Sequence, residues 1–195
     1  MRLKDSLYAP FKHWAEGGSV YITSDPHFGD GAMYGKAIYG NAYDLFSNEA
    51  RAAIINKKLY KNDTLIILGD IGDIEGLKLL KPCYKILILG NHDAGRSVYE
   101  EYFNEIYEGP LVISEKIILS HEPILIPGMI NIHGHDHNSK EHYRVENGYH
   151  INTAGNLVDF TKLNLKHLIE AGVLKEAPSI HRLAIERQKE HKNEM

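Results

Sequence analysis

Seven side chains of types that commonly bind metal ions lie in five short motifs of this sequence, and an apolar run directly precedes each motif. The seven are Asp25, His27, Asp70, Asn91, His121, His135 and His137. They offer carboxylate oxygens, an amide oxygen and imidazole nitrogens, but no thiolate. This mixture suits Mn²⁺, Fe, Zn²⁺ or Ni²⁺, and it contains too much nitrogen for Ca²⁺ or Mg²⁺ alone. The residues therefore predict a metal centre.

The spacing of these side chains favours two ions. Two cations side by side need many ligands, and a carboxylate between them lowers their mutual repulsion. Asp25 and His27 are two residues apart after an apolar run, so both can reach one point, and His135 and His137 repeat that spacing. Asp70 follows the most apolar run and is the predicted bridge between the ions.

Each motif also has a simpler explanation when it is taken alone. Asp25-Pro26-His27 could be a turn, the Gly-Asp and Gly-Asn pairs could mark the ends of strands, and His121 could be a hydrogen-bonded core imidazole. The segment 133–137 is harder to explain in this way, because three imidazoles within five residues are costly without a ligand role. All five motifs together favour the metal centre.

The apolar runs are the elements that must position these side chains. Runs of three to five apolar residues that end in Gly, Asp or Asn are typical of buried strands. Loops at the carboxyl ends of strands are where open α/β sheets assemble their sites. The predicted strands cover residues 20–22, 65–68, 86–89, 117–119 and 129–132. Residues 28–41, rich in glycine and aromatic side chains, are predicted to form a loop close to the site.

Helices and hairpins complete the predicted architecture. Helices are expected over residues 47–59, 75–80, 97–103 and 161–171. Residues 111–114 and 116–120 indicate a hairpin, and so do residues 143–145 and 149–152 around an Asn-Gly turn. Strand–helix alternation followed by antiparallel strands fits two stacked mixed sheets with helices outside. We expect one domain over residues 1–195, with a polar helical tail from about residue 177.

Composition limits the partners and the location of the protein. The formal charge of −4 gives no global reason to expect nucleic acid as partner, although a local basic patch remains open. Cys83 is the single cysteine, which excludes an intramolecular disulfide and fits a reducing compartment. We find neither a signal peptide nor an apolar run of the ~20 residues that would cross a membrane. The predicted location is the cytoplasm, and the sequence does not indicate an oligomeric state.

The motif set resembles that of the calcineurin-like metallophosphoesterases, whose signature is D-x-H, G-D-x-x-D, G-N-H-[D/E], a lone H and G-H-x-H. All five motifs occur here in that order between Asp25 and His137. The flanking residues are similar to those of the small bacterial and phage members. The resemblance implies a four-layer α/β/β/α sandwich with a dinuclear site.

The resemblance also implies a role for each residue that matches the signature. One metal ion would be held by Asp25, His27, Asp70 and His137, and the other by Asp70, Asn91, His121 and His135. His92 matches the histidine that acts on the scissile phosphate without binding metal, and Asp93 matches the carboxylate that orients it. Asp73 matches a carboxylate beside the ligands. Arg96 could contact substrate phosphate or simply be solvated, and His133 is expected beside the ligands or in the core. The other six histidines are expected at the surface or in packing roles.

The activity implied is hydrolysis of a phosphoester by a hydroxide that bridges the two ions, with His92 assisting. The protein phosphatase branch carries Asp-Arg-Gly where this chain has Asp73-Ile74-Glu75, so a protein phosphatase is not expected. The short chain has no insertion for a cap domain and favours a small phosphodiester such as a nucleotide. A phosphomonoesterase, a nuclease acting on nucleic-acid ends and a non-catalytic interaction module remain alternatives. Manganese is the expected metal, with iron, zinc or nickel as alternatives.

Overall fold

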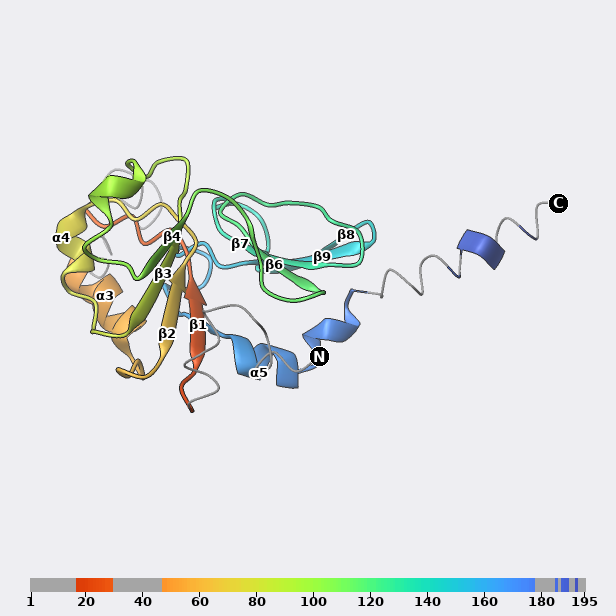
Figure 1. The fold of residues 1–195 in the computed structure, drawn as a ribbon, viewed down its shortest axis with the longest axis horizontal. Coiled ribbons are helices and arrows are strands. Elements are labelled where there is room, and N and C mark those ends of the chain that lie inside the picture. The colour runs from red at the N-terminus through yellow and green to blue at the C-terminus, as the bar shows by residue number, and fades with distance from the viewer. Residues whose placement is uncertain (1–16, 30–46, 178–184, 186, 190–191, 193–195) are drawn as a thin grey trace.

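Two five-stranded sheets form the body of the protein in the computed structural model (Figure 1), which describes residues 17–29, 47–177, 185, 187–189 and 192. The first sheet has the order β10-β1-β2-β3-β4. Its strands β1 to β4 run parallel, and β10 is antiparallel to β1 at one edge. These strands are β1 (Val20–Thr23), β2 (Thr64–Ile67), β3 (Tyr84–Ile88), β4 (Glu105–Tyr107) and β10 (Leu163–Asn164).

The second sheet has the order β5-β6-β7-β9-β8. Its three central strands β6, β7 and β9 run parallel, and antiparallel strands β5 and β8 form its two edges. The strands are β5 (Leu111–Val112), β6 (Ile117–Leu119), β7 (Ile130–His133), β8 (His142–Val145) and β9 (Gly148–Asn152). Both predicted hairpins are therefore present, and the two mixed sheets with flanking helices confirm the predicted α/β architecture.

The main hydrophobic core lies between the sheets. Alternate residues of β1, β2 and β3 meet alternate residues of β6, β7 and β9 there, with Ile22, Ile66, Ile132 and Ile151 fully buried. The remaining residues of β7 and β9 point to the opposite face of the second sheet, as the two-residue period of a strand requires. Asn131, His133 and His150 thus lie on that face.

Helices α3 (Asn48–Asn56) and α4 (Ile74–Leu77) cover the outer face of the first sheet (Figure 1). Ala52 and Ile55 of α3 pack there against the sheet residues Leu65 and Ile67. The side chain of Ser47 caps α3 by accepting a hydrogen bond from the backbone N–H of Ala50. Helix α5 (Leu165–Glu170) and the short 3-10 helix η5 (Val173–Lys175) follow β10 and contribute to the core between the sheets.

The helix predicted over residues 97–103 is instead the 3-10 helix η4 (Arg96–Val98) followed by turns. The backbone N–H groups of residues 98, 99 and 102 donate to carbonyls three residues back, and only that of Phe103 donates four residues back. Buried Tyr99 and Phe103 pack on the first sheet, and the Tyr99 hydroxyl binds the preceding loop. The helix predicted over residues 161–171 starts only at Leu165, because Leu163–Asn164 pairs with β1 as β10. Most of the predicted loop 28–41 and of the polar tail lies outside the described residues.

The parallel strands end at a common edge of the molecule, and the two sheets touch there. Ser24, directly after β1, forms a parallel bridge with Ala154, which follows β9. The loops that leave β1, β2, β3, β6, β7 and β9 therefore meet. No helix in the described part of the chain is both long enough and apolar enough to cross a membrane.

Candidate metal centre

Asp70 lies at the centre of the assembled motifs, with one carboxylate oxygen toward each of two ligand groups. Its Oδ2 is 3.5 Å from His27 Nε2, and its Oδ1 is 3.5 Å from His121 Nε2. The side chain is only 1% exposed. A carboxylate placed in this way has the position expected of a bridge between two cations.

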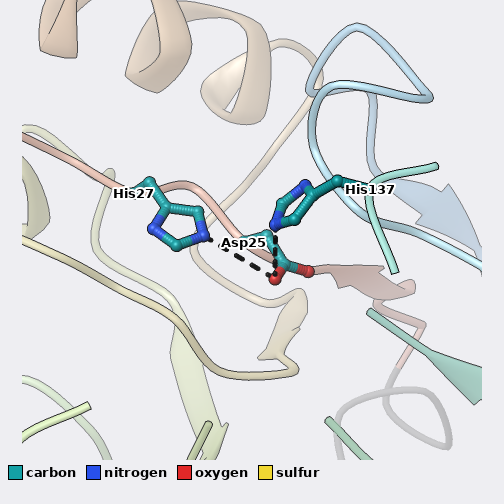
Figure 2. Close-up of side chains that lie close together, drawn as sticks. All are labelled: Asp25, His27 and His137. Atoms are coloured by element: carbon teal, nitrogen blue, oxygen red, sulfur yellow. Dashed lines mark ion pairs between the residues drawn. The ribbon is translucent and has the colours of Figure 1, made fainter. Parts of the chain in front are cut away.

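The first ligand group consists of Asp25, His27 and His137, whose ligand atoms lie within 4.8 Å of one another (Figure 2). Asp25 Oδ1 is 3.9 Å from His27 Nε2 and 3.6 Å from His137 Nε2. Asp25 and His27 follow β1, whereas His137 follows β7 of the other sheet. The pair of sheets is thus needed to form this group.

The second ligand group consists of Asp70, His121 and His135, with Asn91 beside it. Asn91 Oδ1 is 2.8 Å from His121 Nε2 and 3.0 Å from His135 Nδ1, and the two ring nitrogens are 3.2 Å apart. The other ring nitrogen of His121 lies 2.7 Å from the carbonyl oxygen of Leu68 and must donate its hydrogen there. In the neutral ring, Nε2 then presents a lone pair to the group.

The chemistry of this donor set fits divalent cations. Nε2 of His121, Oδ1 of Asn91 and Nδ1 of His135 lie within 3.2 Å of one another, and each atom can offer a lone pair to a cation. The two groups together offer two carboxylates, four imidazoles and an amide, with no thiolate, a mixture that suits manganese, iron, zinc or nickel. The structure thus brings together all seven predicted ligands.

Asn156 is a positioning residue that sequence reasoning missed. Its Oδ1 accepts a hydrogen bond from His137 Nδ1 at 2.6 Å, and its Nδ2 donates to the backbone carbonyl of His137 at 2.9 Å. The second bond fixes which end of the amide is the oxygen, so His137 Nδ1 carries the hydrogen and Nε2 is left to face Asp25. An asparagine shortly after a strand is typical of a turn, so no sequence pattern indicates this role.

Buried Arg51 of helix α3 is a second residue that the sequence did not reveal. Its guanidinium donates hydrogen bonds to the backbone carbonyls of Pro26 and His27 and lies over the Phe160 ring, 5.5 Å from its centre. The helix on the outer face of the first sheet thereby holds the loop that carries His27.

Backbone strain is concentrated at the ligands. Eight non-glycine residues of the described chain have positive φ, and four of them are Asp25, His27, Asp70 and His135, with φ of 51°, 40°, 52° and 65°. Such conformations are uncommon for residues with a side chain and tend to occur at functional sites. Neighbouring loops hold them in place. The N–H of Asp25 donates to the carbonyl of Gly69, the N–H of His27 donates to the carbonyl of Asp70, and both Asp25 carboxylate oxygens accept from the N–H of His135.

Burial dominates the electrostatics of Asp25. It raises the pKa of this carboxyl from 3.8 to about 7, although nearby His121 and the hydrogen bonds from Ser24 and His135 oppose the shift. A buried carboxylate of this kind needs a positive charge beside it to remain ionised. A bound cation would supply that charge.

His92 lies at the open side of the first ligand group. Its side chain is exposed, and its ring centre is 6.1 Å from that of His27. Its backbone N–H donates to Asp70 Oδ1 at 3.0 Å, which fixes the loop on which it sits. The imidazole can therefore reach a molecule bound at the ligands while it stays outside both ligand groups.

Asp93 binds the loop around Asp70. Its carboxylate accepts hydrogen bonds from the backbone N–H groups of Asp70, Ile71 and Gly90 and from the Tyr99 hydroxyl. Among the described residues, no hydrogen bond joins it to the His92 ring. Burial raises the pKa of Asp93, and the backbone donors oppose that shift. Asp93 therefore fixes the loop that carries Asp70, and its role in orienting His92 stays a prediction.

Three residues with weaker predictions lie outside the ligand groups. Asp73 is exposed and caps α4 by accepting from the N–H of Glu75. Arg96 is exposed, with its Nε 3.6 Å from Glu100, as expected of the solvated alternative. His133 is fully buried on the outer face of the second sheet, where it binds Tyr143 and packs on His150. Of the six other histidines, His142 and His167 are exposed, His150 is buried, and the remaining three lie outside the described residues.

Comparison with known proteins identifies similar sequences and structures. A family model described as calcineurin-like phosphoesterase matches residues 18–169. No curated protein matches the chain significantly. Among solved structures, the protein of unknown function AQ665 from Aquifex aeolicus is 26% identical, with a TM-score of 0.64 and coverage of 79% of this chain and 99% of that protein.

Two further solved structures are more distant. The nuclease MPE from Pseudomonas putida is 24% identical, with a TM-score of 0.45 and coverage of 69% of this chain and 66% of that protein. A Vps29 variant from Entamoeba histolytica is 18% identical, with a TM-score of 0.41 and coverage of 70% of this chain and 74% of that protein. These likenesses are too low to carry an argument about the chemistry of this chain.

Proposed function

Because this chain belongs to the calcineurin-like phosphoesterase family, we propose that it hydrolyses a small phosphodiester with the help of two divalent metal ions. The observation that carries the proposal is the position of Asp70. One of its carboxylate oxygens lies 3.5 Å from His27 of the first ligand group, and the other lies 3.5 Å from His121 of the second. A buried carboxylate shared in this way is suited to two cations rather than one.

The chain would divide its ligands between the two ions through this shared residue. Asp25, His27, Asp70 and His137 would hold one ion, and Asp70, Asn91, His121 and His135 the other. When bound, two such ions neutralise phosphate oxygens and lower the pKa of water, so that an attacking nucleophile exists near neutral pH. We propose manganese as the native metal because the donor set mixes imidazoles with carboxylates.

His92 would supply the proton that the departing oxygen needs. It is exposed beside the first ligand group and is not one of the ligands, so its ring remains available to substrate. A positioned acid that protonates a leaving group contributes roughly 10²–10⁴-fold to a rate.

A diester is favoured over a monoester because, apart from the two metal ions, the described site offers few positively charged side chains to bind phosphate. A monoester brings a second negative charge, and the arginines near the motifs are otherwise engaged. Arg51 is buried and holds the His27 loop, and Arg96 pairs with Glu100. The single negative charge of a phosphodiester therefore suits a site that offers two metal ions and the His92 ring but no available arginine.

The proposal is tested by metal reconstitution followed by a panel of substrates. Chelator-treated protein is reloaded with Mn²⁺, Fe²⁺, Zn²⁺ or Ni²⁺ and assayed on bis-aryl phosphate, aryl phosphate, cyclic nucleotides and short oligonucleotides. We expect two ions per chain and the highest kcat/KM on a diester. A preference for the monoester or for oligonucleotides would contradict the substrate class, and two bound ions without any turnover would indicate a non-catalytic role.

Asp70→Asn tests the shared carboxylate directly. Replacing a bridging oxygen with an amide nitrogen should lower the metal content to one ion or fewer per chain and abolish turnover. Asp159→Asn is the matched control, since Asp159 is exposed and has a positive φ that asparagine tolerates. Two firmly bound ions in Asp70→Asn, measured by elemental analysis, would exclude the bridging role.

A further inference from the structure

A hollow of about 330 Å³ opens directly beside the second ligand group. The segments that follow β3, β4 and β6 line it, and two of its lining residues are the ligands Asn91 and His121. Its volume lies at the lower end of the range of roughly 300–1,000 Å³ that small-molecule sites occupy. A molecule whose phosphate lay on the metals could therefore extend into this space.

The walls of the hollow are largely apolar. Leu89, Pro110 and Ile124 line it together with backbone of Gly90 and Gly109. Ile124 is held by its backbone N–H, which donates to the buried side chain of Asn131 at 2.7 Å. Such walls suit the carbon skeleton of a compact organic group rather than a second phosphate.

The rim of the hollow is acidic. Glu108 and Glu122 are exposed lining residues, and neither forms an ion pair within the described part of the chain. Among the described residues that line the hollow there is no lysine or arginine. The hollow therefore favours a neutral or cationic group over an anionic one, in contrast to the adjoining metal centre, which favours anions.

The hollow and His92 lie toward different ligand groups. The His92 ring lies beside His27 of the first group, whereas the hollow adjoins Asn91 and His121 of the second. If His92 protonates the group that departs, the ester group retained on phosphorus is the one directed toward the hollow.

We propose that this hollow binds the retained ester group of the substrate and selects a compact neutral or cationic group over an anionic one. The inference rests on the proposed diesterase function and narrows its substrate class. A polynucleotide would bring further phosphates close to Glu108 and Glu122, so it should be a poor substrate. A diester that carries an amine or ammonium group on a short carbon chain should be a good one.

The test uses the manganese-loaded full chain and three 4-nitrophenyl phosphodiesters that differ only in the second ester group. That group is propyl, 2-trimethylammonioethyl or 3-carboxypropyl. We expect the highest kcat/KM for the cationic probe and the lowest for the anionic one. Two unit charges about 4 Å apart in water change a rate ratio about fivefold, so Glu108→Gln and Glu122→Gln should each lower the ratio of cationic to neutral probe by up to about fivefold.

Glu115→Gln is the matched control, because Glu115 is exposed in the turn before β6, at the other end of that strand from the hollow. It should leave the ratio unchanged. Equal kcat/KM for all three probes, or ratios that the Glu108 and Glu122 variants do not change, would overturn the inference while the diesterase function stood. Absence of turnover with every probe despite two bound ions would overturn the proposed function itself.

Discussion

At the scale of single residues, His92 is the side chain whose role can be separated most cleanly from metal binding. Its ring is exposed 6.1 Å from the His27 ring. Its one hydrogen bond to the described residues runs from its backbone N–H to Asp70, so it survives truncation of the side chain. His92→Ala should therefore keep both ions and lower kcat by roughly 10²–10⁴-fold on the preferred diester.

The measurement combines elemental analysis with steady-state kinetics of the manganese-loaded variant. Arg96→Gln is the comparison, because Arg96 is exposed, pairs with Glu100 and belongs to neither ligand group. It should change kcat less than about twofold. Wild-type turnover in His92→Ala would remove this residue from the reaction.

Asn156 acts through His137 rather than on substrate. Its amide holds the hydrogen on His137 Nδ1 and so leaves Nε2 for the cation. Loss of a partner of this kind commonly lowers metal affinity or activity by 10–100-fold. We expect Asn156→Ala to weaken the first metal site by about that factor, with recovery of activity at high Mn²⁺ concentration.

Isothermal titration calorimetry of the metal-free variant with Mn²⁺ measures this change in affinity. Asn138→Ala is the control, since Asn138 lies next to His137 but is exposed, and its side chain has no hydrogen bond among the described residues. If Asn156→Ala and Asn138→Ala bind Mn²⁺ equally well, the amide does not position His137.

At the scale of secondary-structure elements, helix α3 supports the metal centre through Arg51. This guanidinium is 3% exposed and donates to two backbone carbonyls of the loop that carries His27. Hydrogen bonds to charged groups contribute about 1.5–3 kcal/mol each, and unpaired buried acceptors are costly. Arg51→Met should lower the free energy of unfolding by about 3 kcal/mol and also weaken the first metal site.

Chemical denaturation with and without Mn²⁺ checks both effects. Arg144→Met is the matched exchange, because Arg144 is exposed and its ion pair with Glu176 lies at the surface. Surface pairs of this type contribute about 0–1 kcal/mol. Similar losses of stability in the two variants would show that Arg51 contributes no more than a surface arginine.

The sequence predicted the strands that precede the motifs because each is an apolar run followed by a polar turn. It did not predict β4 or β10, which have three and two residues and are too short to show a pattern. Both pair at sheet edges, so long-range hydrogen bonding and not local preference creates them. The predicted helix near residue 100 was wrong because the Tyr99 hydroxyl is tied to the loop of Asp93 and Ala94, a contact that the spacing of apolar residues does not reveal.

The sequence indicated the candidate ligands, but it did not indicate the residues that hold them in place. Ligand types and spacing are visible in a sequence, whereas Asn156 and Arg51 act through contacts between segments far apart in the chain. The hydrogen bonds of Asp93 to the loop around Asp70 were not predictable for the same reason. The positive φ of Asp25 and His27 is equally invisible, since neighbouring loops impose it.

At the scale of the whole molecule, the second sheet carries a buried histidine pair that should make stability depend on pH. Burial lowers the pKa of His133 to about 4 and also lowers that of His150. Both rings bind the Tyr143 hydroxyl, and His150 Nε2 has no hydrogen-bond partner in the described part of the chain. Protonation of His150 would therefore place a buried positive charge whose Nε2–H has no hydrogen-bond acceptor in the described part of the chain.

The sign follows from the unfolded chain, in which histidine titrates near 6.5. As the pH falls from about 6.5 toward 4, the unfolded chain binds protons that the folded chain does not, so stability decreases. Above about 6.5 the pair is neutral in both states and contributes no slope. His150→Gln should reduce the slope of unfolding free energy against pH in this window, whatever its effect on absolute stability.

Urea denaturation of the chelator-treated protein at several pH values measures this slope. His142→Gln is the control, because His142 is exposed on the neighbouring edge strand and should leave the slope unchanged. Equal slopes in the wild type and His150→Gln would show that the buried ring does not resist protonation.

The contact between the two sheets at Asp25 also determines when, during synthesis, the ligand groups can assemble. Its carboxylate accepts the N–H of His135, more than a hundred residues further along, and the last supporting amide comes later still, at Asn156. A ribosome delivers these segments in order, so the half that emerges first has only part of a chelating cage. A complete set of ligands and their support would therefore require the chain through Asn156, with the second sheet packed on the first.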